Sequence, residues 1–477
     1  MYSKILAGSS ALALIAPAFA GTLTKSADVS KPAEKSALTF ADGLVTVDLE
    51  GRLRFEARSN NRNFDDSIND ANDDSWVISR FRIGVALQLA PWAKLYAQTQ
   101  DTREWNSERV NVPGVNGTEG GDEFDLRQAY LQLSDYKEFP LGITIGRQPL
   151  NYGDNRLVAD SKWGNFGRTF DGAKLRYQQD KFWVDAFAVR PVQTKEEVFN
   201  NNDAEDNFAG IYGGTDALGF QSTELYFLYR DKQDNQSDLD PTNKLDPRGA
   251  WNGPAQRIYT VGTRWKSKKD ALGPWDYSAE FAYQFGDTWT NDRATPRLEH
   301  SAFATAITGG YTWKNAAWKP RLSLEYDYAS GDSNPADGSS QSFQNLFPSN
   351  HAHYGFMDEF AWRNIHDLRL QMNANPTKKL ELELDYHLFW LADTGDYWYR
   401  SNGYSTLRTT TPTGANVRTV GANNFAGSEI DLTATWKVTC TLTIQGGYSH
   451  FFAGSYLADT GASDDADFAY LQATVVF

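Results

Sequence analysis

The fold is decided by the last stretch of the chain, Asp467-Phe-Ala-Tyr-Leu-Gln-Ala-Thr-Val-Val-Phe477. Its small and apolar residues recur at every second position, so they share one face of an extended strand: Ala469, Leu471, Ala473, Val475 and Phe477. A terminal strand with one continuous apolar face is typical of a sheet whose outer side contacts hydrocarbon.

The same period of two returns throughout the chain. In 45–58 the apolar side chains occupy one side and the charged side chains the other, with Val45, Val47, Leu49, Leu53, Phe55 and Ala57 on the apolar side. Residues 79–89 and 380–390 alternate in the same way. An amphipathic helix would repeat near 3.6 residues, so the pattern predicts strands.

About eighteen segments have this pattern, each close to the length that a tilted membrane strand needs. They are 43–58, 76–90, 93–104, 123–136, 139–148, 169–178, 181–190, 206–214, 219–231, 256–267, 275–286, 300–314, 317–329, 363–374, 378–391, 426–438, 440–452 and 466–477. The pattern is weakest at 206–214 and at the boundaries of 139–148, so sixteen strands is the alternative count.

The connections between these segments alternate in length. Long linkers follow the odd-numbered strands, and short ones follow the even-numbered strands, as at Pro91-Trp92, Asn315-Ala316, Asn375-Pro376-Thr377 and Thr439. Short periplasmic turns and long extracellular loops are the architecture of outer-membrane barrels, which must close because an open edge leaves backbone groups unpaired in lipid. We therefore predict an all-β transmembrane antiparallel β-barrel over 42–477. A secreted β-sandwich or propeller is the alternative.

The N-terminus indicates export. Lys4 precedes an apolar run from Ile5 to Ala18, and Ala18-Phe-Ala20 forms an A-x-A site. This pattern predicts a signal peptide over 1–20, cleaved near Ala20, followed by a polar periplasmic leader over 21–41. No later segment has eighteen uninterrupted apolar residues, so no transmembrane helix is expected. The predicted location is the bacterial outer membrane.

The composition agrees with a barrel wall that faces water on one side and lipid on the other. Aromatic residues make up 14% of the chain, although its mean hydropathy is only -0.56. Such a wall carries aromatic belts at both rims, next to lipid and lipopolysaccharide. The net charge of -15 argues against a nucleic-acid partner. Cys440 is the only cysteine and can form no intrachain disulfide.

The polar face of the strands should line the lumen. It carries many charged side chains, among them Arg52, Arg54, Arg80, Arg82, Arg176, Arg264, Arg321, Arg369, Glu383 and Asp385. Basic groups dominate the early strands and acidic groups the late ones. Arginine rings select anions, and opposed walls of unlike charge orient a charged chain. Alternatively, these charges only pair across neighbouring strands. A lumen of about eighteen strands holds water, so a plug would have to come from the long loops.

Four motifs are more specific than the strand pattern: Gly146-Arg-Gln-Pro-Leu-Asn-Tyr-Gly-Asp-Asn-Arg156, Trp163 to Gly172, Leu126 to Leu131 and Leu346 to Gly355. Together they resemble the alginate-export family of outer-membrane barrels. The resemblance implies an eighteen-stranded monomeric channel whose arginine-rich constriction passes an acidic polysaccharide. It also implies that Arg127 and Arg147 are constriction arginines. Arg147 shares the side of Ile143 and Ile145, so an inward aim would need a bulge or a strand end. The last strand resembles the C-terminal signature through which such barrels, here by Phe477, engage the barrel-assembly machinery.

We therefore predict a channel for passive passage of an anionic polysaccharide or oligosaccharide. A general or substrate-selective uptake porin for small solutes is the alternative, with small anionic solutes as possible partners, and an outer-membrane enzyme or adhesin is a third possibility. No G-x-S-x-G element is present, and Ser449 and His450 point to opposite sides of one strand, so no catalytic residues and no cofactor are predicted. His351 and His353 are too few ligands for a metal site, and the aspartates of the first loop lack the spacing of a Ca²⁺ cage.

Overall fold

The computed structural model describes residues 38–61, 63–67, 73–107, 121–194, 199–233, 254–290, 293–404, 406–408 and 421–477. The predicted signal peptide and most of the predicted leader lie outside these ranges. The end of the leader forms β1 (Thr39–Phe40), which pairs with β2 (Val45–Ser59), and the 3-10 helix η1 (Ala41–Gly43). The leader thus runs directly into the first long strand.

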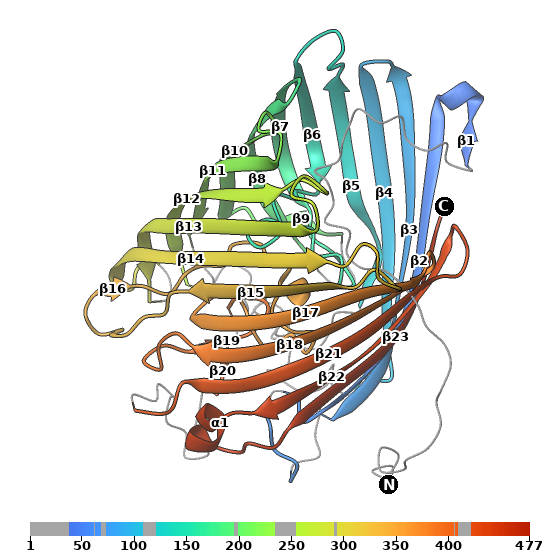
Figure 1. Ribbon diagram of the computed structural model, residues 1–477. Coiled ribbons are helices and arrows are strands. Elements are labelled where there is room, and N and C mark those ends of the chain that lie inside the picture. The colour runs from blue at the N-terminus through green and yellow to red at the C-terminus, as the bar shows by residue number, and fades with distance from the viewer. Residues whose placement is uncertain are drawn as a thin grey trace.

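Eighteen long strands form a closed antiparallel barrel (Figure 1). After β2 come β3 (Asp74–Ala90), β4 (Ala93–Trp105), β5 (Asp122–Ser134), β6 (Leu141–Gln148), β7 (Phe170–Gln179), β8 (Phe182–Gln193), β10 (Asp206–Thr215), β11 (Gln221–Lys232), β12 (Gln256–Ser267), β13 (Trp275–Trp289), β14 (Arg297–Thr312), β15 (Arg321–Ala329), β17 (Ile365–Thr377), β18 (Leu380–Leu391), β21 (Phe425–Lys437), β22 (Leu442–Ala453) and β23 (Ala466–Val476). Each predicted segment corresponds to one of these strands, so the count of eighteen is confirmed.

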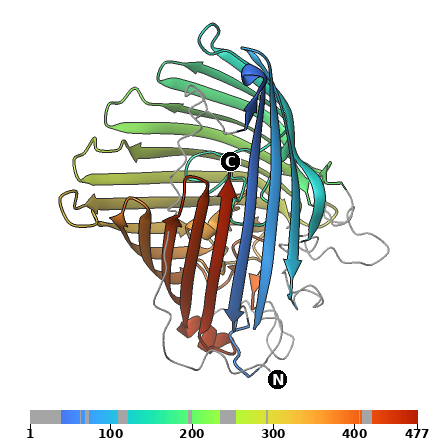
Figure 2. The ribbon, with the colours of Figure 1, turned by 90° about the vertical axis from the view of Figure 1, so that its right-hand side faces the viewer.

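The barrel closes where its last strand meets its first. β23 pairs with β2 from Glu50 opposite Val476 to Ser59 opposite Asp467. Figure 2 shows the red β23 beside the blue β2. Phe477 continues the seam, because its backbone N–H donates to the carbonyl of Leu49 and its carbonyl accepts from the N–H of Leu49. Each of the eighteen long strands therefore has two neighbours, as a membrane barrel requires.

The remaining elements are short and belong to the connections. They are β9 (Asn201–Asn202), β16 (Ser339–Ser340), η4 (Asn350–Ala352), β19 (Trp398–Tyr399), β20 (Thr406–Leu407) and α1 (Ser455–Thr460). Within the described ranges, no helix has the length and apolar character needed to cross a membrane.

The wall of the barrel exposes its apolar side and buries its charged side. On β2, Leu53 and Phe55 are 53% and 44% exposed, whereas Arg54 between them is 0% exposed. Exposed apolar surface in water would cost roughly 25 cal/mol per Å². Hydrocarbon around the outside removes that cost, and the charged side chains of the wall lie on the inside of the barrel.

Three of the four predicted short turns differ from the structure, and the one predicted at Thr439 covers residues 438–441. The turn between β14 and β15 covers 313–320 rather than Asn315-Ala316, because Trp318 and Lys319 have positive φ and Pro320 cannot donate to a ladder. β17 continues through Asn375-Pro376-Thr377, where the register with β18 shifts, and the chain turns at residues 378–379. Between β14 and β15 the predicted strand 317–329 runs through Pro320, which lies in the turn, and at β17 the predicted turn lies within the strand.

Two long connections fold into the bore. We call residues 149–169, between β6 and β7, the plug loop, and residues 330–364, between β15 and β17, the inner loop. Their apolar side chains are almost completely buried, with exposures of 1% for Leu150, 5% for Phe347 and 0% for Trp362. Val158 and Phe347 form a parallel β-bridge that joins the two loops. The bore of this barrel is thus occupied by a packed core supplied by its own loops.

Candidate functional site: a plugged bore beside a cationic cavity

Four arginines on β2 and β3 hold the plug loop against the wall. We call Arg52, Arg54, Arg80 and Arg82 the basic wall. Arg52 donates to the carbonyls of Lys162 and Trp163 at 3.1 and 3.0 Å, and Arg54 donates to the Trp163 carbonyl at 2.9 Å.

Arg80 and Arg82 continue the basic wall on β3. Arg80 donates to the Gly164 carbonyl at 2.9 Å and Arg82 to the Phe166 carbonyl at 3.0 Å. Glu50 pairs with Arg80 at 2.5 Å and with Arg82 at 3.4 Å. All four arginines face the bore and are nearly buried, because plug-loop carbonyls occupy the positions where an anion would otherwise bind.

Arg127 enters the bore through a β-bulge in β5. The register pairs Gln98 with Gln128 but Thr99 with Leu126, which leaves Arg127 as the extra residue. Two consecutive side chains can then face inward, and Arg127 and Gln128 both donate to the side-chain carbonyl of Gln98, at 3.0 and 2.7 Å. Arg127 also lies 3.8 Å from Asp160 of the plug loop. It therefore lies beside the plug, as one of the two arginines suggested by the family resemblance.

Arg147 lies elsewhere, at the outer end of β6. It pairs with Asp171 on β7 at 2.8 Å and donates to the carbonyls of Leu126 and Asn200 at 2.9 and 3.0 Å. The register of β6 with β7 runs through Arg147 without a shift, so its side chain stays on the face of Ile145, which is 49% exposed. Arg147 therefore bonds to neighbouring backbone at the end of β6 and does not lie with the four arginines of the basic wall.

The other charged side chains expected in the solute path pair mostly with neighbouring strands. Arg176 pairs with Asp185 at 2.6 Å, Arg321 with Asp276 at 2.6 Å, and Arg369 with Asp385 at 2.6 Å and Glu383 at 3.7 Å. Arg264 binds Glu224 at 2.8 Å and also pairs with Asp154 of the plug loop. These residues all belong to the inner face, but they occupy separate sectors of the barrel.

One segment of the plug loop crosses the bore and touches three sectors of the wall. Every second side chain of 152–156 takes part. The Tyr152 hydroxyl donates to Asp185 on β8 at 2.8 Å. Asp154 binds Arg264 and Lys266 on β12. Arg156 pairs with Asp327 at 2.6 Å and Glu325 at 2.9 Å on β15. With the basic wall on β2 and β3, the plug loop is thus anchored around the circumference of the barrel.

The two histidines considered as metal ligands serve as contacts between the loops. His351 stacks on Trp163 at 3.8 Å between ring centroids and bonds Asp358 at 3.1 Å. His353 Nε2 lies 2.8 Å from the carbonyl of Asp154. The two rings therefore have different partners, and His353 joins the inner loop to the plug loop.

The contact between His353 and Asp154 predicts that closure of the bore by the plug loop depends on pH. Burial, together with the Arg156 guanidinium, lowers the pKa of His353 from 6.5 to about 3. The neutral ring is thus favoured in the folded state. The stabilisation that His353 gives to the folded plug is fully present above about pH 6.5 and is lost as the pH falls toward about 3. We expect the plug to loosen over this window, measured as a rising single-channel conductance. His353→Gln, which stays neutral, should flatten the rise, and an unchanged pH profile in that variant would contradict this role.

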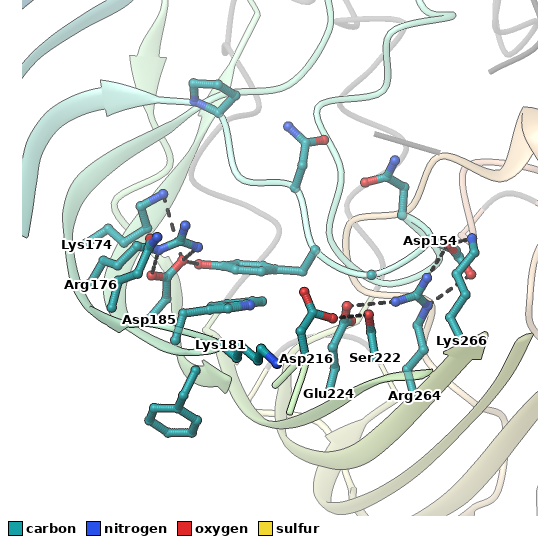
Figure 3. A pocket seen from close by; sticks show the side chains of 18 of the residues that line it. Asp154, Lys174, Arg176, Lys181, Asp185, Asp216, Ser222, Glu224, Arg264 and Lys266 are labelled. Atoms are coloured by element: carbon teal, nitrogen blue, oxygen red, sulfur yellow. Dashed lines mark hydrogen bonds and ion pairs between the residues drawn. The ribbon is translucent and has the colours of Figure 1, made fainter. Parts of the chain in front are cut away.

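A cavity of about 1220 Å³ lies beside the plug on the side of β7, β8, β11 and β12 (Figure 3). Residues from the short turns, including Lys181, Asp216 and Lys268, contribute to its lining, so it extends to the short-turn end, which faces the periplasm in outer-membrane barrels. Nine basic side chains line it against five acidic ones. The basic residues are Lys94, Lys162, Lys174, Arg176, Lys181, Arg264, Lys266, Lys268 and Lys269. We call it the cationic cavity.

Several lysines of the cationic cavity form no close ion pair with a described carboxylate. In the part of the chain that the structure describes, no carboxylate lies within ion-pair distance of Lys94, Lys162, Lys181 or Lys269. A concave site with excess positive charge and low-dielectric walls raises the local concentration of anions. The cavity is therefore suited to receive an anionic solute.

The sequence reasoning missed Asp154 and most of these lysines. Lys94 and Lys266 have the parity of inward residues on their strands, which is a signal that could have found them. Lys181, Lys268 and Lys269 come from short turns, where no periodicity assigns a direction. Asp154 was visible only as one letter of the motif around Gly146–Arg156.

Comparison with known proteins identifies a matching sequence family and barrels of similar fold. The pattern of the family described as Alginate export matches residues 44–470. No curated protein matches the chain.

Among solved structures, Pseudomonas aeruginosa OpdK with vanillate is similar at 11% identity and a TM-score of 0.57, over 90% of this chain and 98% of that one. P. aeruginosa OccK2 (OpdF) in complex with glucuronate has 11% identity and a TM-score of 0.56, over 92% of this chain and 99% of that one. P. aeruginosa OccD3 (OpdP) has 12% identity and a TM-score of 0.56, over 92% of each chain. At these identities the likeness is one of fold.

Proposed function

The chain belongs to the alginate-export family, and from that premise we propose that it is a passive channel for an anionic, carboxylate-bearing polysaccharide or oligosaccharide. Its fold is that of an outer-membrane channel. The proposed location is the outer membrane, in contact with lipid and lipopolysaccharide, with the chain acting as a monomer after removal of the signal peptide.

The observation that carries this proposal is the excess of basic side chains in the cationic cavity. An anionic chain arriving at the short-turn end would meet Lys181, Lys268 and Lys269 first, and then Lys174, Arg176 and Arg264 deeper in the wall. Each carboxylate would find an ammonium or guanidinium at a short distance, which lowers the barrier for entry. The same positive charges repel cations. Neutral sugars are not attracted by them.

Beyond the cavity, the route runs along the basic wall. Arg52, Arg80 and Arg82 now donate to plug-loop carbonyls. If the plug loop moves aside, these donors become available to substrate carboxylates, so the loss of one set of hydrogen bonds is offset by a stronger, charge-assisted set. We propose that Arg127 lies on this route and that Arg147, at the outer end of β6, supports the wall.

A second candidate function is uptake of a small carboxylate. Two of the similar barrels were crystallised with vanillate and glucuronate, both small carboxylates. The cationic cavity, at about 1220 Å³, exceeds the roughly 300–1000 Å³ of ordinary ligand sites and can accept a single such molecule without any movement of the plug. This reading differs from the first in requiring no polymer.

Measurement of ion selectivity tests the charge argument. In a planar bilayer with a salt gradient, the reversal potential should indicate anion preference, and a soluble polyuronate on the short-turn side should alter the current. Cation preference combined with no effect of the polyuronate would exclude both candidate functions. Block by monomeric uronate at the same carboxylate concentration would favour the second candidate.

Removing cavity lysines should shift selectivity in a predictable direction. We expect the double variant Lys174→Gln/Lys181→Gln to lose anion preference by about threefold, because two of nine lining cations are neutralised. Lys314→Gln is the matched control: Lys314 lies in another turn at the same end, pairs with Asp270 and does not line the cavity. Equal shifts in both variants would mean that only the general surface charge matters.

A further inference from the structure

One carboxylate of the plug loop, that of Asp154, already pairs with two cations of the cationic cavity. Arg264 forms a two-point contact with Asp154, with Nη2 to Oδ1 at 2.6 Å and Nε to Oδ2 at 3.0 Å. Lys266 Nζ adds a bond to Oδ1 at 2.9 Å, and the Ser278 hydroxyl donates to Oδ2 at 3.1 Å. Figure 3 shows the Asp154 side chain meeting Arg264 and Lys266 at the edge of the cavity.

This set of four donors has the form of a carboxylate-binding site. A guanidinium in bidentate contact, an ammonium and a hydroxyl together satisfy both oxygens of a single carboxylate. Glu224 takes the remaining Nη1 of Arg264 at 2.8 Å and orients the guanidinium from behind. The chain therefore carries a carboxylate receptor on β12 and β13 and fills it with a residue of its own plug.

The position of Asp154 links this receptor to the closure of the bore. Asp154 lies between Tyr152, which bonds Asp185, and Arg156, which pairs with Asp327. Its backbone carbonyl also accepts the hydrogen bond from His353 of the inner loop. A displacement of the Asp154 side chain therefore disturbs the segment of the plug loop that crosses the bore and its junction with the inner loop.

We propose that Asp154 is a substrate-mimicking latch, which a carboxylate of an oligomeric uronate displaces from Arg264 and Lys266 so that the plug loop is released. This inference rests on the proposed function and deepens it by naming how the channel opens. The substrate enters through the cavity lysines, and its carboxylate takes the four donors that Asp154 gives up. No bond is made or broken covalently, and closure follows when the last carboxylate leaves.

The latch should distinguish an oligomer from a monomer. Asp154 is tethered, so it competes with an effective concentration on the order of millimolar or higher. A monomeric uronate offers one carboxylate and has no such advantage. An oligomer that also contacts Lys174, Lys181 or Lys268 gains the same advantage through its other carboxylates, and therefore competes on equal terms.

Binding of an oligouronate to the detergent-solubilised barrel tests the latch directly. We expect Asp154→Asn to raise the apparent affinity by about tenfold or more, because the receptor is then no longer occupied. Asp154→Glu should remain near the unmodified protein. Asp160→Asn is the matched control, since Asp160 is another plug-loop carboxylate, lies beside Arg127 and does not line the cavity. Monomeric uronate and a neutral oligosaccharide complete the set of ligands.

The outcomes separate the latch from the proposed function. An anion-selective channel in which Asp154→Asn leaves oligouronate affinity unchanged would overturn the latch alone. An absence of anion preference and of oligouronate binding in every variant would overturn both. If Asp154→Asn fails to fold, hydrogen exchange on the unmodified protein decides: amides 152–156 should exchange faster with bound oligouronate, and slower or unchanged exchange would overturn the latch.

Discussion

Replacing residues 155–166 by an equal number of glycines and serines should raise the single-channel conductance by about tenfold or more. The replacement removes Arg156, Leu157 and Trp163, which fix the plug loop to β15, to the apolar core of the bore and to the basic wall. A glycine-serine segment is a flexible coil that cannot offset the entropy of being ordered in the bore. The lumen of an eighteen-stranded barrel is then wide enough for water and ions.

The control for this variant is the same replacement at residues 336–338, which are exposed at the outer edge of the inner loop. Both proteins should keep the heat-dependent gel mobility of a folded barrel. Unchanged conductance in the plug-loop variant would mean that the inner loop alone closes the bore. A conductance increase in both variants would mean that any change in these loops loosens the packing.

Arg156→Ala should lower the free energy of unfolding by about 3–5 kcal/mol. Arg156 is 4% exposed and is the ion-pair partner of Asp327 and Glu325, whose own exposures are 0% and 9%. Its removal leaves two carboxylates buried side by side, and their mutual repulsion adds to the desolvation of each. Denaturant titration of the barrel refolded into detergent measures the loss.

The triple variant Arg156→Ala/Glu325→Gln/Asp327→Asn should recover most of this loss, because none of these three positions then carries a buried charge. Arg168→Ala is the comparison within the same loop: Arg168 donates to the carbonyls of Ala159 and Pro348, both at 3.0 Å, so its loss should cost about 1–2 kcal/mol. A triple variant no more stable than Arg156→Ala would show that packing of the arginine, rather than its charge, stabilises the plug.

The barrel could be predicted from the sequence because its signal is local. Alternation at period two fixes which residues of β2 or β18 face inward, and alternating linker lengths fix which end carries the turns. The boundaries were harder, as at β15, where Trp318, Lys319 and Pro320 delay the strand to Arg321. Such turns depend on backbone angles that composition constrains only weakly.

The plug could not be predicted because its contacts are distant in sequence. Arg52 and Trp163, 111 residues apart, meet only once the barrel has closed. Periodicity gave the inward direction of Arg52 and Arg80 but not what would lie opposite them. Arg127 faces inward only because of a bulge, which one residue in the β4–β5 register decides. The family resemblance named Arg127 and Arg147 together, but the bulge turns Arg127 inward, whereas the unshifted register of β6 keeps Arg147 on the face of Ile145.

The seam between β2 and β23 has a consequence for biogenesis. Contacts across it join residues from opposite ends of the chain, such as Asn60 and Asp465, 405 residues apart. Contacts of such high contact order form late, so the cylinder is completed only once β23 has been made. A polypeptide that lacks β23 would expose two unsatisfied strand edges and become a target for proteolysis. An incomplete barrel is thereby removed before it can make the membrane leaky.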